Sequence, residues 1–139
     1  MNSNLEDKKI ITKNWFKSLR NSICNEFERI EYIMSKKKIL FKKKKWNAGG
    51  SSKGGGTFAL IENGSVFEKV GVNISTVSGK FNKEFRKKIP GALNNPNFWA
   101  SGISIVAHMK NPKVPAFHFN TRFIITSRSW FGGGMDMTP

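Results

Sequence analysis

The strongest constraint on the fold is a short segment in which apolar and polar residues alternate. Phenylalanine recurs at positions 117, 119 and 123, while the residues between them include His118, Asn120 and Arg122. A period of two is typical of a β-strand with one face on an apolar core. The sequence therefore predicts a strand over residues 116–126 that turns these three polar side chains toward one side. An edge strand with a merely solvated polar face would show the same pattern.

A second periodicity, of three to four residues, predicts an amphipathic helix over roughly residues 8–34. The apolar stripe consists of Trp15, Phe16, Leu19, Ile23, Phe27, Ile30 and Met34, and charged residues such as Arg20 and Glu31 are placed on the other faces. Such a stripe is nearly always core, so we expect the helix to pack on a sheet. Cys24, the single cysteine, lies in the stripe and is interpreted as a small buried hydrophobe in a reducing compartment.

Residues 38–139 are predicted to form the sheet, with glycine-rich loops between strands. Asn63-Gly64 is a strong hairpin signal, the segment 47–56 is predicted to be a loop, and the segment 80–97 is predicted to be a basic surface connection. Strands are expected at 39–46, 57–61, 66–70, 71–77, 98–106, 116–126 and from 130 onward. The predicted class is α+β, a mostly antiparallel sheet with the helix packed on one face.

The chain is strongly basic, with 24 Lys and Arg residues against 9 acids and a formal net charge of +15. The runs Lys36–Lys38 and Lys42–Lys45 could bind nucleic acid or an anionic membrane surface, although alternate residues of a strand or a solvated face are the stronger interpretation. A basic nucleic-acid-binding module is therefore an alternative function that rests on charge alone. No run of about 18 apolar residues suggests a membrane span, and the first residues lack the order of a secretory signal. We expect a cytoplasmic protein.

Four motifs, in order along the chain, resemble the oxygen-dependent coproporphyrinogen III oxidase family. They are Val66–Ser75, Gly102–His108, Asn111–Arg122 and Trp130–Pro139. The resemblance runs from about Trp15 to the last residue and is weak between Gly79 and Asn97. Chains of that family are longer and continue past Thr138-Pro139. The sequence is therefore expected to represent the N-terminal half of a larger single domain, with residues 1–139 as one part of it.

The resemblance implies oxidative decarboxylation of coproporphyrinogen III to protoporphyrinogen IX in haem biosynthesis. It implies O₂ as co-substrate, no organic cofactor, and a homodimer whose interface lies largely outside this chain. A truncated or degenerate fragment, inactive by itself, is the alternative within the same family.

The resemblance also assigns substrate-binding positions to Ser104, Asn120 and Arg122. Arginine suits a propionate, because its planar fork donates two parallel hydrogen bonds to a carboxylate. The family often has cations after the tryptophan that matches Trp46, whereas this chain continues with Asn-Ala-Gly-Gly. Lys53 is expected to be only a partial substitute for those cations.

His118 resembles the proton donor of the family, and Asp136 resembles the acid that accepts hydrogen bonds from the pyrrole N–H groups. Without the resemblance, Asp136 would be interpreted as an ordinary acid in a glycine turn. Some bacterial members are described with a metal at the positions of His108 and His118. Two histidines without further ligands do not make a closed site, so a divalent metal is not expected to bind this chain by itself.

Overall fold

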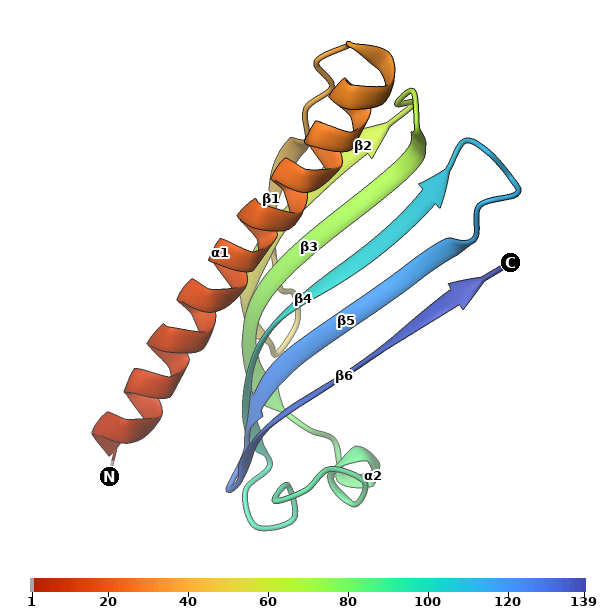
Figure 1. Cartoon of the computed structure of the whole chain (residues 1–139). Helices are drawn as coiled ribbons and strands as arrows, with labels where there is room; N and C mark the ends of the chain where they lie inside the picture. The colour runs from red at the N-terminus through yellow and green to blue at the C-terminus, as the bar shows by residue number, and fades with distance from the viewer. Residues whose placement is uncertain (1) are drawn as a thin grey trace.

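The computed structural model describes residues 2–139, which form one long helix laid along a six-stranded sheet (Figure 1). The helix α1 spans Asn2–Ser35, and a short helix α2, Lys83–Arg86, lies between the third and fourth strands. The strands are β1 (Lys42–Asn47), β2 (Lys53–Glu62), β3 (Phe67–Lys80), β4 (Asn97–Met109), β5 (Ala116–Ile125) and β6 (Ser129–Thr138). The predicted α+β class is confirmed.

Each strand pairs in antiparallel fashion with its neighbours in sequence, in the order β1-β2-β3-β4-β5-β6. The predicted turn at Asn63-Gly64 joins β2 and β3, and Asn63 adopts the left-handed conformation there, with φ of 54°. In the ladder, Val72 lies opposite Ile105, which lies opposite Phe119. Since residues opposite one another share a face, this register collects the apolar residues of successive strands on one side.

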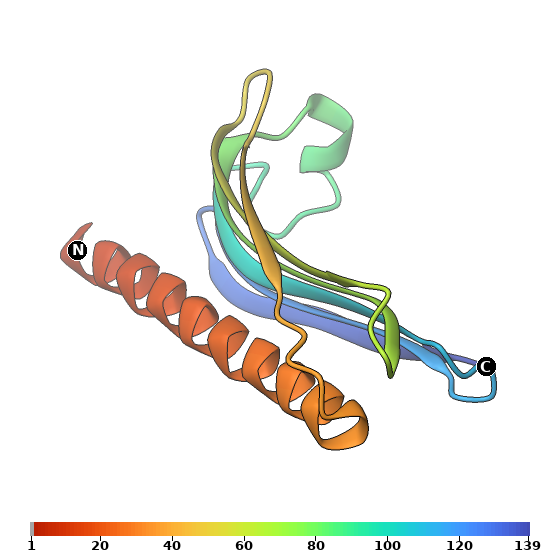
Figure 2. The same ribbon diagram turned by 90° about the horizontal axis from the view of Figure 1, so that it is seen from above.

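The core lies between α1 and that apolar side of the sheet. Figure 2 shows α1 along one side of a curved sheet, while the other side is free of it. Phe16, Cys24 and Phe27 of α1 are buried in the same cluster as Val72 and Ile105. The expected buried cysteine is confirmed, and burial raises the pKa of the Cys24 thiol to about 11.

A buried carboxylate fixes the end of α1 to the sheet. Glu31 is fully buried, and its side chain accepts hydrogen bonds from the backbone N–H groups of Ser65, Val66 and Phe67 at 2.8, 2.9 and 2.8 Å. A Cβ atom added at Gly64 would overlap the Glu31 carboxylate, so glycine is needed beside it. The sequence had placed Glu31 on a polar face, and that expectation is wrong because three donors at the β2–β3 turn replace the water that a buried carboxylate loses.

Arg20 is the second charged residue that was expected at the surface and is buried. Its Nε donates to Asn21 Oδ1 at 2.7 Å, whereas its Nη1 has no partner among residues 2–139. It occupies the α1 surface that contacts the sheet, one turn from both Phe16 and Cys24. The long aliphatic stem of arginine makes such a position tolerable.

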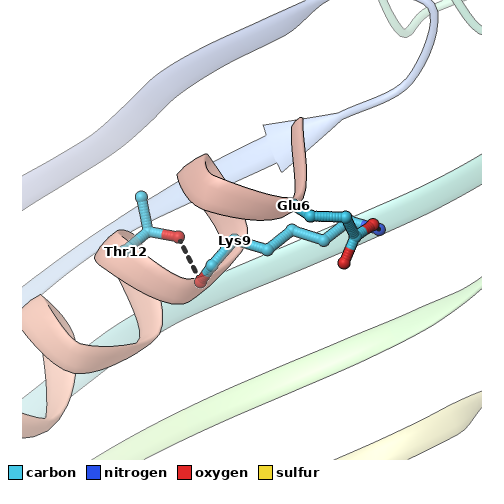
Figure 3. A network of polar contacts seen from close by, with 3 residues as sticks. All are labelled: Glu6, Lys9 and Thr12. Carbon is cyan, nitrogen blue, oxygen red and sulfur yellow. Dashed lines mark hydrogen bonds and ion pairs between the residues drawn. The ribbon is translucent and has the colours of Figure 1, made fainter. Parts of the chain in front are cut away.

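α1 begins at Asn2, earlier than the predicted helix over 8–34, and ends at Ser35. Near this end of the helix, Lys9 Nζ pairs with Glu6 Oε1 at 3.0 Å, and Thr12 Oγ1 donates to the carbonyl of Lys9 at 3.2 Å (Figure 3). Thr12 Oγ1 also donates to the carbonyl of Lys8 at 2.8 Å. The Thr12 side chain is thereby satisfied although it is buried. Among the described residues, no helix combines the length and apolar character that a membrane span requires.

Two segments outside the predicted strand cores differ from expectation, one between α1 and β1 and one between β1 and β2. The glycine-rich segment 47–56 was predicted to be a loop, but Gly54–Gly56 belong to β2. A Cβ at Gly56 would overlap the carbonyl oxygen of Ile74, so these glycines permit close packing of neighbouring strands. Ile39–Phe41 precede the first strand, which begins at Lys42, later than the expected start of the sheet portion at residue 38.

The predicted surface connection 80–97 contains α2 and a packed turn. Ala92 is buried, and Thr126 Oγ1, at the turn between β5 and β6, donates to the Pro90 carbonyl at 2.7 Å. This connection therefore supports the end of the sheet rather than only bridging two strands.

The two edge strands differ in character. β1 exposes Lys42–Lys45, and charged residues on an edge disfavour pairing with other chains. β6 exposes Phe131, Met135 and Met137. Exposed apolar residues on an edge strand favour pairing with a further segment or chain.

Replacing Glu31 by glutamine tests the contact between α1 and the β2–β3 turn. The amide brings N–H groups against backbone donors, so the free energy of unfolding should fall by about 2–4 kcal/mol. Glu26→Gln, which alters an exposed pair with Arg29 at 2.8 Å, is the matched control and should cost less than about 0.5 kcal/mol. Urea denaturation measures both, and equal small losses would show that Glu31 does not hold the helix.

Candidate active site

Strand β5 divides its side chains as the alternation predicted. Phe117, Phe119 and Phe123 belong to or pack against the core under α1. His118, Asn120 and Arg122 consequently lie on the sheet face turned away from α1, which we call the open face. Figure 2 places this face on the inner side of the curved sheet.

Pairing of β5 with β4 brings the three predicted substrate-binding residues together. Ser104 lies directly opposite Asn120, and Gly102 lies opposite Arg122. Ser104, Asn120 and Arg122 all line one hollow of about 250 Å³ on the open face. Their side chains make no hydrogen bond or ion pair with any described residue, so their polar groups are available to a ligand.

Pairing of β5 with β6 brings together the two predicted catalytic residues. His118 lies opposite Asp136, and its Nδ1 is 3.8 Å from the nearer carboxylate oxygen, Oδ2. The side chains are 42% and 65% exposed, respectively. The separation is longer than a hydrogen bond, so both carboxylate oxygens can still accept from a ligand. The sequence placed each residue on a strand but could not supply this register.

Two glycines of β6 lie on the open face beside these residues, so no side chain projects from the backbone at those two positions. Gly134 lies opposite Asn120 and Gly132 opposite Arg122. A Cβ added at Gly134 would meet nothing within 4 Å, so the space above it is empty of protein. Gly133, which has the other orientation, is held by packing, because a Cβ there would overlap the Asn120 carbonyl oxygen. A flat ligand could approach the backbone closely at Gly132 and Gly134.

The two histidines proposed as metal ligands are near one another but do not form a cluster. His108 lies on β4, two residues beyond Val106, and Val106 is the residue opposite His118. Such diagonal positions are about 7–8 Å apart. Within the described part of the chain, no group of three or more His, Cys, Asp or Glu side chains could hold a metal ion.

The hollow also contains a residue that sequence reasoning did not select. Asn73 of β3 lies opposite Ser104, lines the same hollow, and accepts a hydrogen bond from Trp46 Nε1 at 2.8 Å. The available signal was the alternation of Val72, Asn73 and Ile74, which puts Asn73 on the polar side of its strand. Lys53, considered as a substitute cation, lines a different hollow together with Ser78.

Comparison with known proteins places these residues in a family. A family described as Coproporphyrinogen III oxidase matches residues 11–139. The chain is 54% identical over 140 residues to an oxygen-dependent coproporphyrinogen-III oxidase of Rickettsia africae (strain ESF-5), covering 98% of this chain and 49% of that protein. The enzymes so named from Rickettsia akari (strain Hartford) and Rickettsia bellii (strain OSU 85-389) are 54% and 53% identical over 96% and 93% of this chain. The chain spans about half the length of these curated relatives.

The exposure of His118 and Asp136 predicts that neither supports the fold. Asp136→Asn and His118→Ala should each change the free energy of unfolding by less than about 0.5 kcal/mol, because exposed ion pairs contribute little. Phe123→Ala, on the buried face of the same strand, should cost about 3 kcal/mol or more. Thermal and urea unfolding of the three variants provide the comparison. A large loss for Asp136→Asn would indicate a structural role instead.

Proposed function

The chain belongs to the coproporphyrinogen III oxidase family, and we propose that it supplies the substrate-binding sheet of an enzyme that converts coproporphyrinogen III to protoporphyrinogen IX with O₂. The observation that supports this best is the convergence of Ser104, Asn120 and Arg122 on one hollow. These residues come from two strands, and the register between β4 and β5 is what joins them. Because the chain spans about half of its relatives, we propose the complete reaction for an active site that also contains the remaining half.

The hollow matches one arm of the substrate rather than the whole tetrapyrrole. Coproporphyrinogen III bears four propionates on a large flexible ring, and a volume of about 250 Å³ is enough for a carboxylate and its short chain. We assign to Arg122 the bidentate contact with the carboxylate, while Ser104 and Asn120 donate further hydrogen bonds. The ring would then lie over Gly132 and Gly134 of β6, where the backbone carries no side chain.

The reaction removes one carboxylate and two hydrogens from each of two arms. An arm R–CH₂–CH₂–CO₂H becomes R–CH=CH₂ with release of CO₂, while O₂ takes up the two hydrogens and becomes H₂O₂. The electrons come from the pyrrole-bearing substrate, so the protein has to hold the arm, orient the ring and move protons. We assign proton transfer to His118, because an imidazole ring can both donate and accept a proton.

We assign to Asp136 the role of accepting hydrogen bonds from the pyrrole N–H groups. Its carboxylate is exposed and not hydrogen-bonded to His118, so it can meet several donors at once. Positive charge that develops on the ring during oxidation would strengthen these contacts. Location in the cytoplasm, assembly as a homodimer and the absence of an organic cofactor are part of the same proposal, and the single buried cysteine fits a reducing compartment.

A chimera provides the test of the proposed function. This chain is joined to the part of the Rickettsia africae protein that it does not match, and oxidation of coproporphyrinogen III is followed. Arg122→Lys keeps the charge but loses the planar fork, so substrate binding should weaken by about 1–3 kcal/mol. Arg128→Lys, in the exposed turn between β5 and β6, is the matched control and should have no effect.

In the same assay, Asp136→Asn should lower kcat more than it raises KM, since the interaction strengthens in the transition state. A chimera that folds but binds no tetrapyrrole would refute the proposed function. An unchanged kcat in Asp136→Asn would refute only the role given to that residue.

A further inference from the structure

Asn73 stands in line with two of the proposed substrate contacts. The ladder places Asn73 of β3 opposite Ser104 of β4, which is opposite Asn120 of β5. Neighbouring strands are about 4.8 Å apart, so the two amides flank the Ser104 hydroxyl on the open face. All three side chains are only partly exposed and line the same hollow. Neither the resemblance nor the proposed function gives Asn73 a role.

Trp46 determines which way the Asn73 amide faces. An indole N–H can only donate a hydrogen bond, so the atom that receives it at 2.8 Å must be the amide oxygen Oδ1. The Nδ2 group, with its two donors, is then left without a partner among residues 2–139. Trp46 reaches from β1 across β2 to β3, and the residue opposite it on β2 is Gly56, which has no side chain to block the indole.

We propose that Asn73 forms a carboxylate subsite with Ser104, in which the amide Nδ2 donates to a propionate oxygen of the bound tetrapyrrole. Trp46 is the positioning residue, because its indole prevents the amide from turning its oxygen toward the ligand. The subsite rests on the proposed function, since it names a further contact to the same substrate. It adds hydrogen-bond donors to a hollow in which Arg122 is the one cation among the lining residues.

A purely structural interpretation of the Trp46–Asn73 bond makes a different prediction. If the bond served only to tie β1 to β3, then Asn73→Asp would be harmless, because a carboxylate of the same shape still accepts from the indole. If Asn73 binds the ligand, the same variant replaces two donors by a negative charge facing a carboxylate. Ligand affinity, measured together with stability, therefore separates the two roles.

The test titrates coproporphyrin III, the fluorescent oxidised form that keeps all four propionates, into the chimera that contains the unmatched part of the Rickettsia africae protein. Asn73→Asp should weaken binding about tenfold or more while leaving the melting temperature unchanged or higher. The matched control is Asn47→Asp, which introduces the same charge on the residue next to Trp46. Because successive residues of a strand point to opposite faces, Asn47 lies on the other face of β1, and this variant should leave affinity unchanged. Trp46→Phe keeps the ring but removes the N–H, so it should weaken binding about threefold, and it should add little in an Asn73→Asp background.

A second readout needs no variant of the subsite. In nuclear magnetic resonance spectra of the chimera with this chain's sequence unchanged, the side-chain amide of Asn73 should shift during the titration together with that of Asn120. Equal affinity of Asn73→Asp and wild type, or a shift of the Asn120 amide without one of Asn73, would overturn the subsite while the proposed function stands. Binding that is absent in the wild type, or that Arg122→Ala does not weaken, would overturn both.

Discussion

Three hydrogen bonds to the Glu31 carboxylate fix the end of α1 over the apolar side of the sheet. They join the last turns of α1 to the β2–β3 turn, and the rest of the helix then lies along one face of the strands. In an antiparallel sheet every strand has two alternative faces, and a shift of one residue exchanges them. Once α1 covers the phenylalanine side of β5, His118, Asn120 and Arg122 have to lie on the open face. The chemistry proposed for this chain therefore depends on a contact far from the hollow.

The open face combines polar side chains with glycine positions at which the backbone carries no side chain. Ser104 and Asn120 line a hollow, and β6 beside it has no side chain on this face at Gly132 and Gly134. Since the side chains of Ser104, Asn120 and Arg122 have no hydrogen-bond partners among the described residues, they are available to an external ligand. The six strands place contributions from β1, β3, β4, β5 and β6 within one register, although these strands are spread over most of the chain. Assembly of the site is thus a property of the sheet as a whole.

The sequence predicted the features that depend on local pattern. The alternation in β5, the apolar stripe of α1 and the turn at Asn63-Gly64 each follow from the spacing of residue types. The structure confirms them, except that Trp15 and Met34 of the predicted stripe are exposed, so their expected burial is wrong. The resemblance supplied the site residues, and the structure brings Ser104, Asn120 and Arg122 to one hollow and places His118 opposite Asp136. Their roles in binding and catalysis stay predictions.

Other features depend on partners that are distant in sequence and could not be predicted. Glu31 and Arg20 were assigned to the surface because charge normally indicates exposure, and only the three N–H donors of the β2–β3 turn explain the burial of Glu31. From the sequence, Gly54–Gly56 resemble a loop, and the reason for glycine at these positions of β2 is the close approach of the neighbouring strands. Asn73 became a candidate only when the register set it beside Ser104 and the indole of Trp46 fixed its orientation.

The central claim is that the open face of this sheet binds the carboxylates of a tetrapyrrole. The most direct measurement is a crystal structure of the chain, completed by the unmatched part of the Rickettsia africae protein, with coproporphyrin III bound. We expect a propionate carboxylate within hydrogen-bond distance of the Arg122 guanidinium, with the ring over Gly132 and Gly134. Carboxylates held instead on the other side of the sheet, for example in the hollow of about 310 Å³ beside Lys13 and Lys17, would contradict it.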